Sequence, residues 1–198
     1  MRLFGKSIIK IAGVSLSVNG NENINFTQPH IYISNHASMM DIPCVLAGIP
    51  QLVGFVYKKE LHWIPFLGIA LKWGKIHIPF HRQKVMSAIE SLEQAASAVK
   101  TGQSVLLFAE GTRTKDGNLQ PFKRGAFYMA VRAGVPVVPL TINGTFPILP
   151  KKSLMIQPGN VSLHIGKPIY LSGEIGKEAE KKLMNDVRTD IELHYKQQ

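Results

Sequence analysis

The chain has 198 residues, enough for one domain with a substantial core, and we expect a single domain over residues 1–198. It has 23 lysine and arginine residues against 13 aspartate and glutamate residues, which gives a net charge of +10. This charge favours nucleic acid, an anionic membrane or a phosphorylated substrate as partner, although a basic surface that only contacts solvent would give the same net charge. Cys44 is the only cysteine, which excludes an internal disulfide, and no apolar run reaches the roughly 18 residues that a membrane-spanning helix needs.

The first twelve residues combine basic and apolar side chains. Arg2, Lys6 and Lys10 recur every four residues among leucine and isoleucine. This pattern predicts a short helix within residues 1–12 that either contacts a membrane surface or packs on the domain as an ordinary terminal helix. Because no small-residue cleavage site follows a long apolar core, we expect no cleaved signal peptide.

Runs typical of strands alternate with runs typical of helices along the rest of the chain. The apolar stripe from Val85 to Val99, for example, predicts an amphipathic helix that ends at Gly102. This alternation indicates an α/β fold with a mixed central sheet flanked by helices. The expected strands cover residues 14–18, 31–33, 52–57, 76–80, 105–108, 135–142 and 161–165, and the expected helices cover residues 38–46, 85–99, 123–132 and 177–195.

Prolines interrupt one of the expected strands. Pro136 and Pro139 lie within residues 135–142, and proline cannot donate a ladder hydrogen bond, so the sequence predicts an edge strand or an irregular strand there. The unusually apolar stretch 61–73 belongs either to the core or to an acyl groove or lipid contact.

A first polar cluster, residues 35–41, lies where a strand gives way to a helix and contains His36 and Asp41. If His36 is in the loop and Asp41 in the first helical turn, the carboxylate can hold one imidazole nitrogen and leave the other for a substrate. An imidazole held in this way is suited to take the proton of an alcohol near neutral pH. In the alternative interpretation, Asp41 only completes a capping box with Ser38, and His36 is an ordinary loop residue.

A second polar cluster, residues 108–113, also follows a strand. Gly111 permits close backbone approach or a positive φ, and the planar fork of Arg113 suits a phosphate monoester. Glu110 either accepts hydrogen bonds from substrate hydroxyls or positions Arg113; a turn with a surface ion pair is the alternative. Two basic pairs, Lys58-Lys59 and His81-Arg82, follow other strands and either add positive charge around a phosphate or are solvated.

Other chemistries find little support in the sequence. The seven histidines show no spacing typical of a zinc site, so we expect no metal. Cys44 falls within an apolar helix and is expected in the core rather than as a nucleophile. Basic and aromatic residues are not interleaved along strands, so we expect no nucleic-acid partner.

Taken in order, these clusters resemble the glycerolipid acyltransferase family, in particular the 1-acylglycerol-3-phosphate acyltransferases. Asn35-His36-x-x-x-x-Asp41 resembles the catalytic block of the family, and Phe108-Ala109-Glu110-Gly111-Thr112-Arg113 resembles its third block, with Ala109 where proline is usual. Residues 78–82 are similar to the second block, although His81 replaces the usual acid, and residues 135–139 are similar to the fourth. The resemblance covers about residues 13–166.

The resemblance implies a fold of the glycerol-phosphate acyltransferase type and direct acyl transfer without a metal, a cofactor or a covalent acyl-enzyme. His36 would deprotonate the sn-2 hydroxyl of 1-acylglycerol 3-phosphate, with Asp41 orienting the imidazole. The hydroxyl would attack the thioester of acyl-CoA or an acyl carrier protein and give phosphatidate in phospholipid biosynthesis, with backbone N–H groups stabilising the oxyanion. Arg113, Arg82 and Lys58 would hold the phosphate, and Glu110, Gly111 and Thr112 would shape that site.

The resemblance also implies work at the cytoplasmic face of a membrane, as a peripheral or monotopic protein bound to lipid. Basic and exposed apolar residues would attach the chain, each surface lysine or arginine contributing about 1 kcal/mol against anionic lipid. Three alternatives stay open: another lysolipid as acceptor, glycerol 3-phosphate as acceptor, or a catalytically inactive lipid-binding module.

Overall fold

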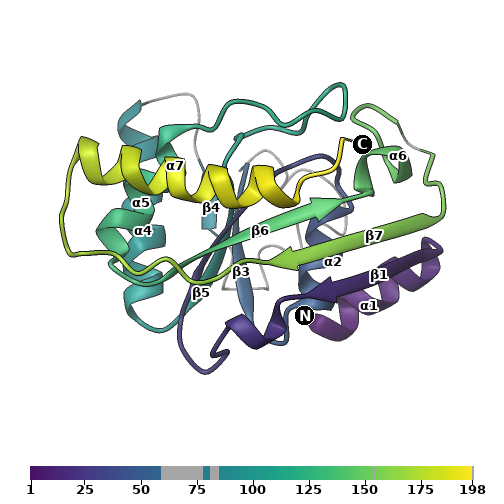
Figure 1. Ribbon diagram of the computed structural model, residues 1–198, viewed down its shortest axis with the longest axis horizontal. Coiled ribbons are helices and arrows are strands. Elements are labelled where there is room, and N and C mark those ends of the chain that lie inside the picture. Colours follow the sequence, from purple (N-terminus) through teal and green to yellow (C-terminus); the bar gives the residue numbers. More distant parts are fainter. Residues whose placement is uncertain (59–77, 81–84, 154, 198) are drawn as a thin grey trace.

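The computed structural model describes residues 1–58, 78–80, 85–153 and 155–197, and the strands of this part form one mixed sheet (Figure 1). The strands are β1 (Val14–Asn19), β2 (Ile31–Ser34), β3 (Val53–Lys58), β4 (Ile78–Phe80), β5 (Ser104–Phe108), β6 (Val137–Asn143) and β7 (Gly159–Ile165). Their order is β1-β7-β6-β2-β5-β3-β4, and the β6–β7 pair is antiparallel whereas the other neighbours run parallel. The predicted α/β class with a mixed sheet is confirmed.

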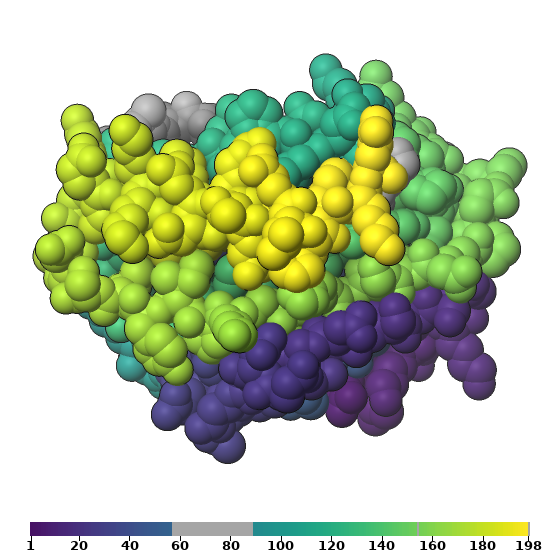
Figure 2. Space-filling view, viewed as in Figure 1, coloured from purple at the N-terminus to yellow at the C-terminus, as the bar shows by residue number. Residues whose placement is uncertain are grey.

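Helices cover both faces of this sheet. They are α1 (Arg2–Ile11), α2 (Asp41–Gly48), α4 (Val85–Lys100), α5 (Arg124–Ala133), α6 (Thr145–Ile148) and α7 (Lys177–His194), together with the 3-10 turn η1 (Asn21–Asn23). Helices α1 and α2 pack into one apolar cluster, and α4, α5 and α7 pack into a second cluster on the other face. Figures 1 and 2 show α7 lying across the face formed by β6 and β7.

Strand β2 is the centre of the sheet and divides its side chains between the two clusters. Tyr32 points into the first cluster, whereas Ile31 and Ile33 point into the second, and all four residues of the strand are buried. Burial on both faces is typical of an interior parallel strand. It gives the residues that follow the end of β2 a rigid support.

Strand β6 lies inside the sheet although it contains Pro139, so of the two predicted alternatives the edge strand is wrong and the irregular strand is confirmed. It pairs with β2 on one side and β7 on the other, and all of its residues are buried. Regular pairing with β7 ends at Leu140 and resumes only at an isolated bridge between Val137 and Ile169. In that interruption the Pro139 carbonyl accepts a hydrogen bond from the Gly166 N–H (2.9 Å). Pro139 has no N–H to donate, and it therefore lies where the hydrogen bonding between β6 and β7 is already irregular.

Helix boundaries follow the prediction closely, with one shift that matters for the site. Helix α2 begins at Asp41 rather than at Ser38, because a turn precedes it. Helix α5 ends at Gly134, which adopts a φ of 67°. Cys44 is fully buried in the core, as expected. The predicted strand 76–80 is seen at residues 78–80, and the apolar stretch 61–73 lies outside the described residues.

The expected helix at the start of the chain is present as α1 and packs on α2. The two helices approach so closely that a Cβ added at Gly5 would lie 2.8 Å from the Pro43 carbonyl oxygen. Glycine at this position is therefore required by the packing. No helix within the described residues is both long and apolar enough to cross a membrane.

Candidate active site

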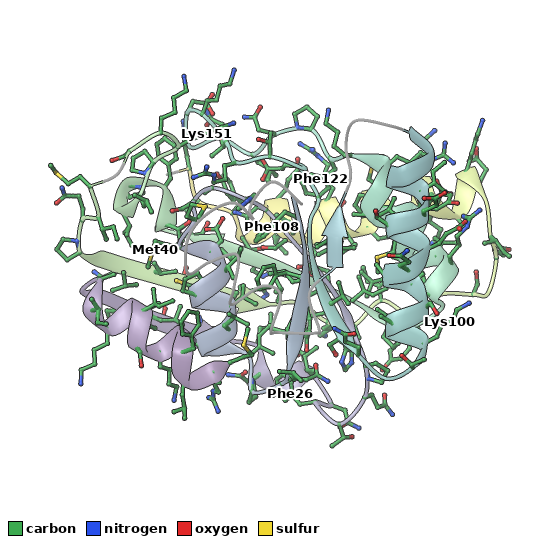
Figure 3. All side chains as sticks on the ribbon, turned by 180° about the vertical axis from the view of Figure 1, so that it is seen from behind. Phe26, Met40, Lys100, Phe108, Phe122 and Lys151 are labelled. Carbon is green, nitrogen blue, oxygen red and sulfur yellow. The ribbon has the colours of Figure 1, made fainter. Side chains whose placement is uncertain are left out.

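The two predicted polar clusters meet at the carboxyl edge of the parallel strands. Strands β2 and β5 are parallel neighbours in which Ser34 is opposite Phe108, so the loops that follow them leave the sheet side by side. A hydrogen bond from the Ala109 N–H to the Ser34 carbonyl (2.9 Å) holds the two loop starts together. Figure 3 places Phe108, Phe122 and Lys151 toward this edge, with Phe26 and Lys100 toward the opposite one. Ligand sites of open α/β sheets lie at this edge.

The side chains of His36 and Asp41 are in direct contact, as predicted. His36 Nδ1 lies 2.7 Å from Asp41 Oδ2, and the carboxylate is fully buried. The same oxygen accepts hydrogen bonds from the backbone N–H groups of Ala37 (2.8 Å) and Ser38 (2.9 Å). The second oxygen, Oδ1, accepts the hydroxyl of Thr145 at the start of α6 (2.5 Å). Asp41 thus holds the turn and contacts the imidazole at once, so it does more than complete a capping box.

The imidazole is held in one orientation by its surroundings. A carboxylate beside Nδ1 favours the tautomer with a proton on Nδ1, which leaves the lone pair of Nε2 available as a base. The ring stacks on Phe108, with 3.8 Å between centroids and 11° between planes. The side chain retains 16% exposure. His36 is therefore fixed but still accessible from outside.

Asn35 fixes the backbone just before the histidine. Its side-chain amide donates to the Ile142 carbonyl (2.9 Å), and its carbonyl accepts from the Ile142 N–H (2.8 Å). This pair of hydrogen bonds joins the loop after β2 to the interior strand β6. Ser38 adds a further tie, because its hydroxyl donates to the Leu149 carbonyl (2.9 Å).

Glu110 accepts hydrogen bonds from backbone N–H groups of the site. One carboxylate oxygen accepts the N–H of His36 (2.7 Å), and the other accepts the N–H of Gln120 (3.0 Å). The residue is only 3% exposed. From the sequence we expected Glu110 either to accept hydrogen bonds from substrate hydroxyls or to position Arg113. The structure instead uses both oxygens to join the loop that carries His36 to the loop of residues 110–121.

Burial raises the pKa of Glu110 from 4.5 to about 7. The negative charge of Asp41 adds to this rise, whereas the two backbone N–H donors and Arg188 lower the pKa. Desolvation is the largest of these effects, because water is excluded from both oxygens. The carboxyl therefore changes its ionisation near neutral pH while it holds the loop that carries His36.

The loop after β5 brings Arg113 next to the backbone of the loop that carries His36. Gly111 takes a φ of 67°, which turns the chain sharply, and its N–H donates to the Phe108 carbonyl (3.0 Å). Two residues later, Arg113 is partly exposed and makes no ion pair with any described residue. The next residue, Thr114, donates its N–H to the His36 carbonyl (2.9 Å). This hydrogen bond keeps the backbone of Arg113 next to the loop that carries His36.

Lys151 contacts this loop from a segment that sequence reasoning did not select. Its Nζ donates to Thr112 Oγ1 (3.1 Å) and to the Arg113 carbonyl (3.3 Å) (Figure 3). Lys151 and Thr145 both lie after β6, more than a hundred residues from His36, and no local motif marks either of them. For the other predicted phosphate ligands, the Lys58 backbone ends β3, and the Lys58 side chain and Arg82 lie outside the described residues.

The fold and the site together define an α/β protein in which a histidine contacts a buried aspartate, next to a loop that carries Arg113. Residues 15–143 match the family model described as Acyltransferase. The chain belongs to this acyltransferase family.

Similar proteins carry a more specific name. The chain is 41% identical over 155 residues to a chloroplastic 1-acyl-sn-glycerol-3-phosphate acyltransferase of Brassica napus, covering 77% of this chain and 44% of that protein. It is 30% identical over 174 residues to the human 1-acyl-sn-glycerol-3-phosphate acyltransferase alpha, covering 87% of this chain and 61% of that protein. The crystal structure of the 1-acyl-sn-glycerophosphate acyltransferase of Thermotoga maritima matches with a TM-score of 0.83 and 31% identity, covering 98% of this chain and 78% of that chain. The chain spans about half the length of the curated relatives it matches.

Proposed function

We propose that this chain transfers a fatty-acyl group from a thioester to the sn-2 hydroxyl of 1-acylglycerol 3-phosphate, giving phosphatidate. The observation that carries the proposal is the 2.7 Å contact between His36 Nδ1 and the buried carboxylate of Asp41. The two relatives and the solved structure described above, all named as acyltransferases of this acceptor, lend further support at 30–41% identity. The acyl donor is acyl-CoA or an acyl carrier protein.

In the proposed reaction, His36 Nε2 takes the proton of the sn-2 hydroxyl as its oxygen attacks the thioester carbonyl. The tetrahedral intermediate then collapses, the carbon–sulfur bond breaks, and the proton on Nε2 passes to the leaving thiolate. Asp41 stabilises the imidazolium that forms between these two steps. The cycle needs no metal, no cofactor and no acyl-enzyme, because the histidine ends in its starting state.

The acceptor phosphate is proposed to lie against Arg113 and Lys151. Arg113 offers a planar fork for two phosphate oxygens, and Lys151 brings a second cation to the same loop through Thr112. Lys58 and Arg82 remain proposed contributors on the basis of the resemblance. Glycerol 3-phosphate and other lysolipids remain alternatives, since they present the same hydroxyl and phosphate.

Helix α1 is the proposed membrane contact, which would place the chain on the cytoplasmic face as a peripheral or monotopic protein. One side of α1 packs on α2, whereas Leu3, Phe4 and Ile11 are largely exposed. Lys6 and Lys10 are exposed on the same helix. Apolar side chains flanked by lysines are typical of helices that lie at a lipid surface.

The decisive test is thiol release from acyl-CoA or acyl carrier protein in the presence of 1-acylglycerol 3-phosphate. His36→Ala is expected to lower the rate by at least about 10²–10⁴, the usual contribution of a positioned base. Circular dichroism and the melting temperature of the variant report whether it has folded. Mass spectrometry of the products from a panel of lysolipids and glycerol 3-phosphate identifies the acceptor. Thiol release by folded His36→Ala at the wild-type rate would refute the base, and wild-type binding without turnover on any acceptor would favour a lipid-binding module.

A further inference from the structure

A second group of polar side chains lies away from the loops of the acyltransferase site. Strand β7 contributes His164, and helix α7 contributes Asp190 and His194, four residues apart on one face of the helix. Each side chain offers one ligand atom, and these atoms all lie within 4.8 Å of one another. The group therefore bridges the helix that crosses the sheet in Figures 1 and 2 and the strand beneath it.

One oxygen of the carboxylate in this group has no hydrogen bond. Asp190 Oδ1 is buried, and the nearest imidazole nitrogen, His194 Nδ1, is 3.8 Å away, although the Asp190 side chain as a whole is 27% exposed. A buried carboxylate oxygen without a hydrogen bond is costly and calls for a missing partner.

The sheet makes room for this carboxylate. A Cβ placed on Gly166, just after β7, would lie 2.6 Å from Asp190 Oδ1. The carboxylate thus occupies the space that a side chain at residue 166 would fill. An aspartate that pointed into solvent would not require a residue without a side chain just after β7.

The two imidazoles lie directly against each other. Their rings stack with 3.6 Å between centroids, where two positive charges would repel each other. His194 Nδ1 lies 2.9 Å from the Asp190 carbonyl oxygen, so the carbonyl can accept its proton and leave Nε2 as a donor atom. A ring nitrogen held by a backbone carbonyl is the usual support of a metal-bound histidine.

We propose that His164, Asp190 and His194 bind a divalent transition-metal ion of the zinc type. Two imidazole nitrogens and one carboxylate oxygen suit Zn²⁺, with a fourth position for water. Tetrahedral zinc requires its ligand atoms to be about 3.3 Å apart, so binding requires these atoms to approach from separations within 4.8 Å and the two stacked rings to rotate out of their nearly parallel planes. The proposed site shares no residue with the reaction proposed above.

The ion would fasten the end of α7 to the sheet, and that end touches the active-site loop. The Asn143 amide donates to the His194 carbonyl (3.1 Å). The next residue, Tyr195, donates its hydroxyl to the carbonyl of Gly117 (2.5 Å), which belongs to the loop of residues 110–121. The structure therefore assigns the metal a structural role, with an indirect effect on the loop that supports His36.

The test is metal binding by the full chain after removal of metal with a chelator. Addition of Co²⁺ is expected to give one equivalent of the visible absorption of a low-coordinate site, and Zn²⁺ is expected to displace it. Zn²⁺ at about a hundredfold excess over its Kd is expected to raise the Tm by roughly 5–10 °C. No binding by the wild-type chain, or binding without a change in Tm, would overturn the proposal.

Variants locate the ion. His164→Gln and Asp190→Asn are expected to weaken binding by more than the roughly 10–100-fold that loss of an outer-shell partner costs. Asp186→Asn, an exposed aspartate on the same helix, and His36→Ala are expected to bind as the wild type does. Equal binding by all four variants would overturn the assignment, as would loss of the ion in His36→Ala.

A direct measurement keeps the test valid if the two ligand variants fail to fold. X-ray absorption at the zinc edge of the wild-type chain is expected to show imidazole scattering from about two ligands at roughly 2.0 Å, with oxygen completing the shell. A shell of oxygen alone, or one with a single imidazole, would overturn the proposed ligand set.

Discussion

Glu110 makes the stability of this protein depend on pH in a direction opposite to that of most carboxylates. Its pKa is raised from 4.5 to about 7 by burial, so the folded chain binds this proton more tightly than the unfolded chain does. The stabilisation is fully present below about pH 4.5 and is lost as the pH rises through about 7. A rise of about 2.5 in pKa corresponds to about 3 kcal/mol of unfolding free energy, an order-of-magnitude figure.

Glu110→Gln isolates this contribution, because glutamine has nearly the same shape and does not ionise. Its side-chain oxygen can accept only one of the N–H groups of His36 and Gln120, so the variant should be less stable than the wild type near pH 4.5. As the pH rises to 8, the wild type loses about 3 kcal/mol that the variant keeps. The measurement is urea unfolding of both proteins at steps from pH 4.5 to 8.5, with the slope m checked for constancy.

The quantity to follow is the difference between the two proteins, since other titrating groups contribute equally to both. Glu178→Gln provides the control, because Glu178 is an exposed glutamate on α7 and should leave the pH dependence unchanged. Parallel stability curves for wild type and Glu110→Gln would show that Glu110 titrates normally. That result would refute the argument that burial controls this carboxyl.

Two further predictions concern the reacting groups. Asp41→Asn should lower kcat by about 10³–10⁴ with little change in KM, because the amide no longer fixes the Nδ1–H tautomer of His36; steady-state kinetics showing a loss below tenfold would contradict this. Arg113→Ala should raise KM for a phosphate-bearing acceptor by about 10–100-fold, the value of a charge-assisted hydrogen bond, whereas Lys100→Ala, which removes a cation toward the opposite edge (Figure 3), should not. Equal effects of the last two substitutions would show that only overall charge matters.

Local patterns in the sequence predicted most of this fold because its elements carry their own signals. The apolar stripe of residues 85–99 became α4, and the αL glycine at residue 134 ended α5. The His36–Asp41 contact was also foreseeable, since five residues across a strand-to-helix junction bring two side chains together. Short-range geometry decides all of these features.

Features that depend on distant partners left no such signal. Thr145 reaches Asp41 across 104 residues, and nothing near Thr145 in sequence announces that contact. Pro139 left an edge strand and an irregular strand equally open, because a local rule cannot show whether a neighbouring strand lies on each side and where its pairing is interrupted. His164 likewise shows no metal-site spacing, because its proposed partners lie on a helix that begins twelve residues after β7 ends.

The structure shows how His36 is held in place for its proposed role as a base. Its backbone N–H is held by Glu110, its carbonyl by Thr114, its Nδ1 by Asp41, and its ring face by Phe108. Among the described residues, none makes a hydrogen bond to Nε2. Every polar group of this residue except the proposed base is therefore engaged before substrate arrives, so no free energy is needed to orient it during the reaction. The two buried carboxylates both hold this residue: Asp41 fixes the imidazole, and Glu110 fixes the backbone N–H of His36.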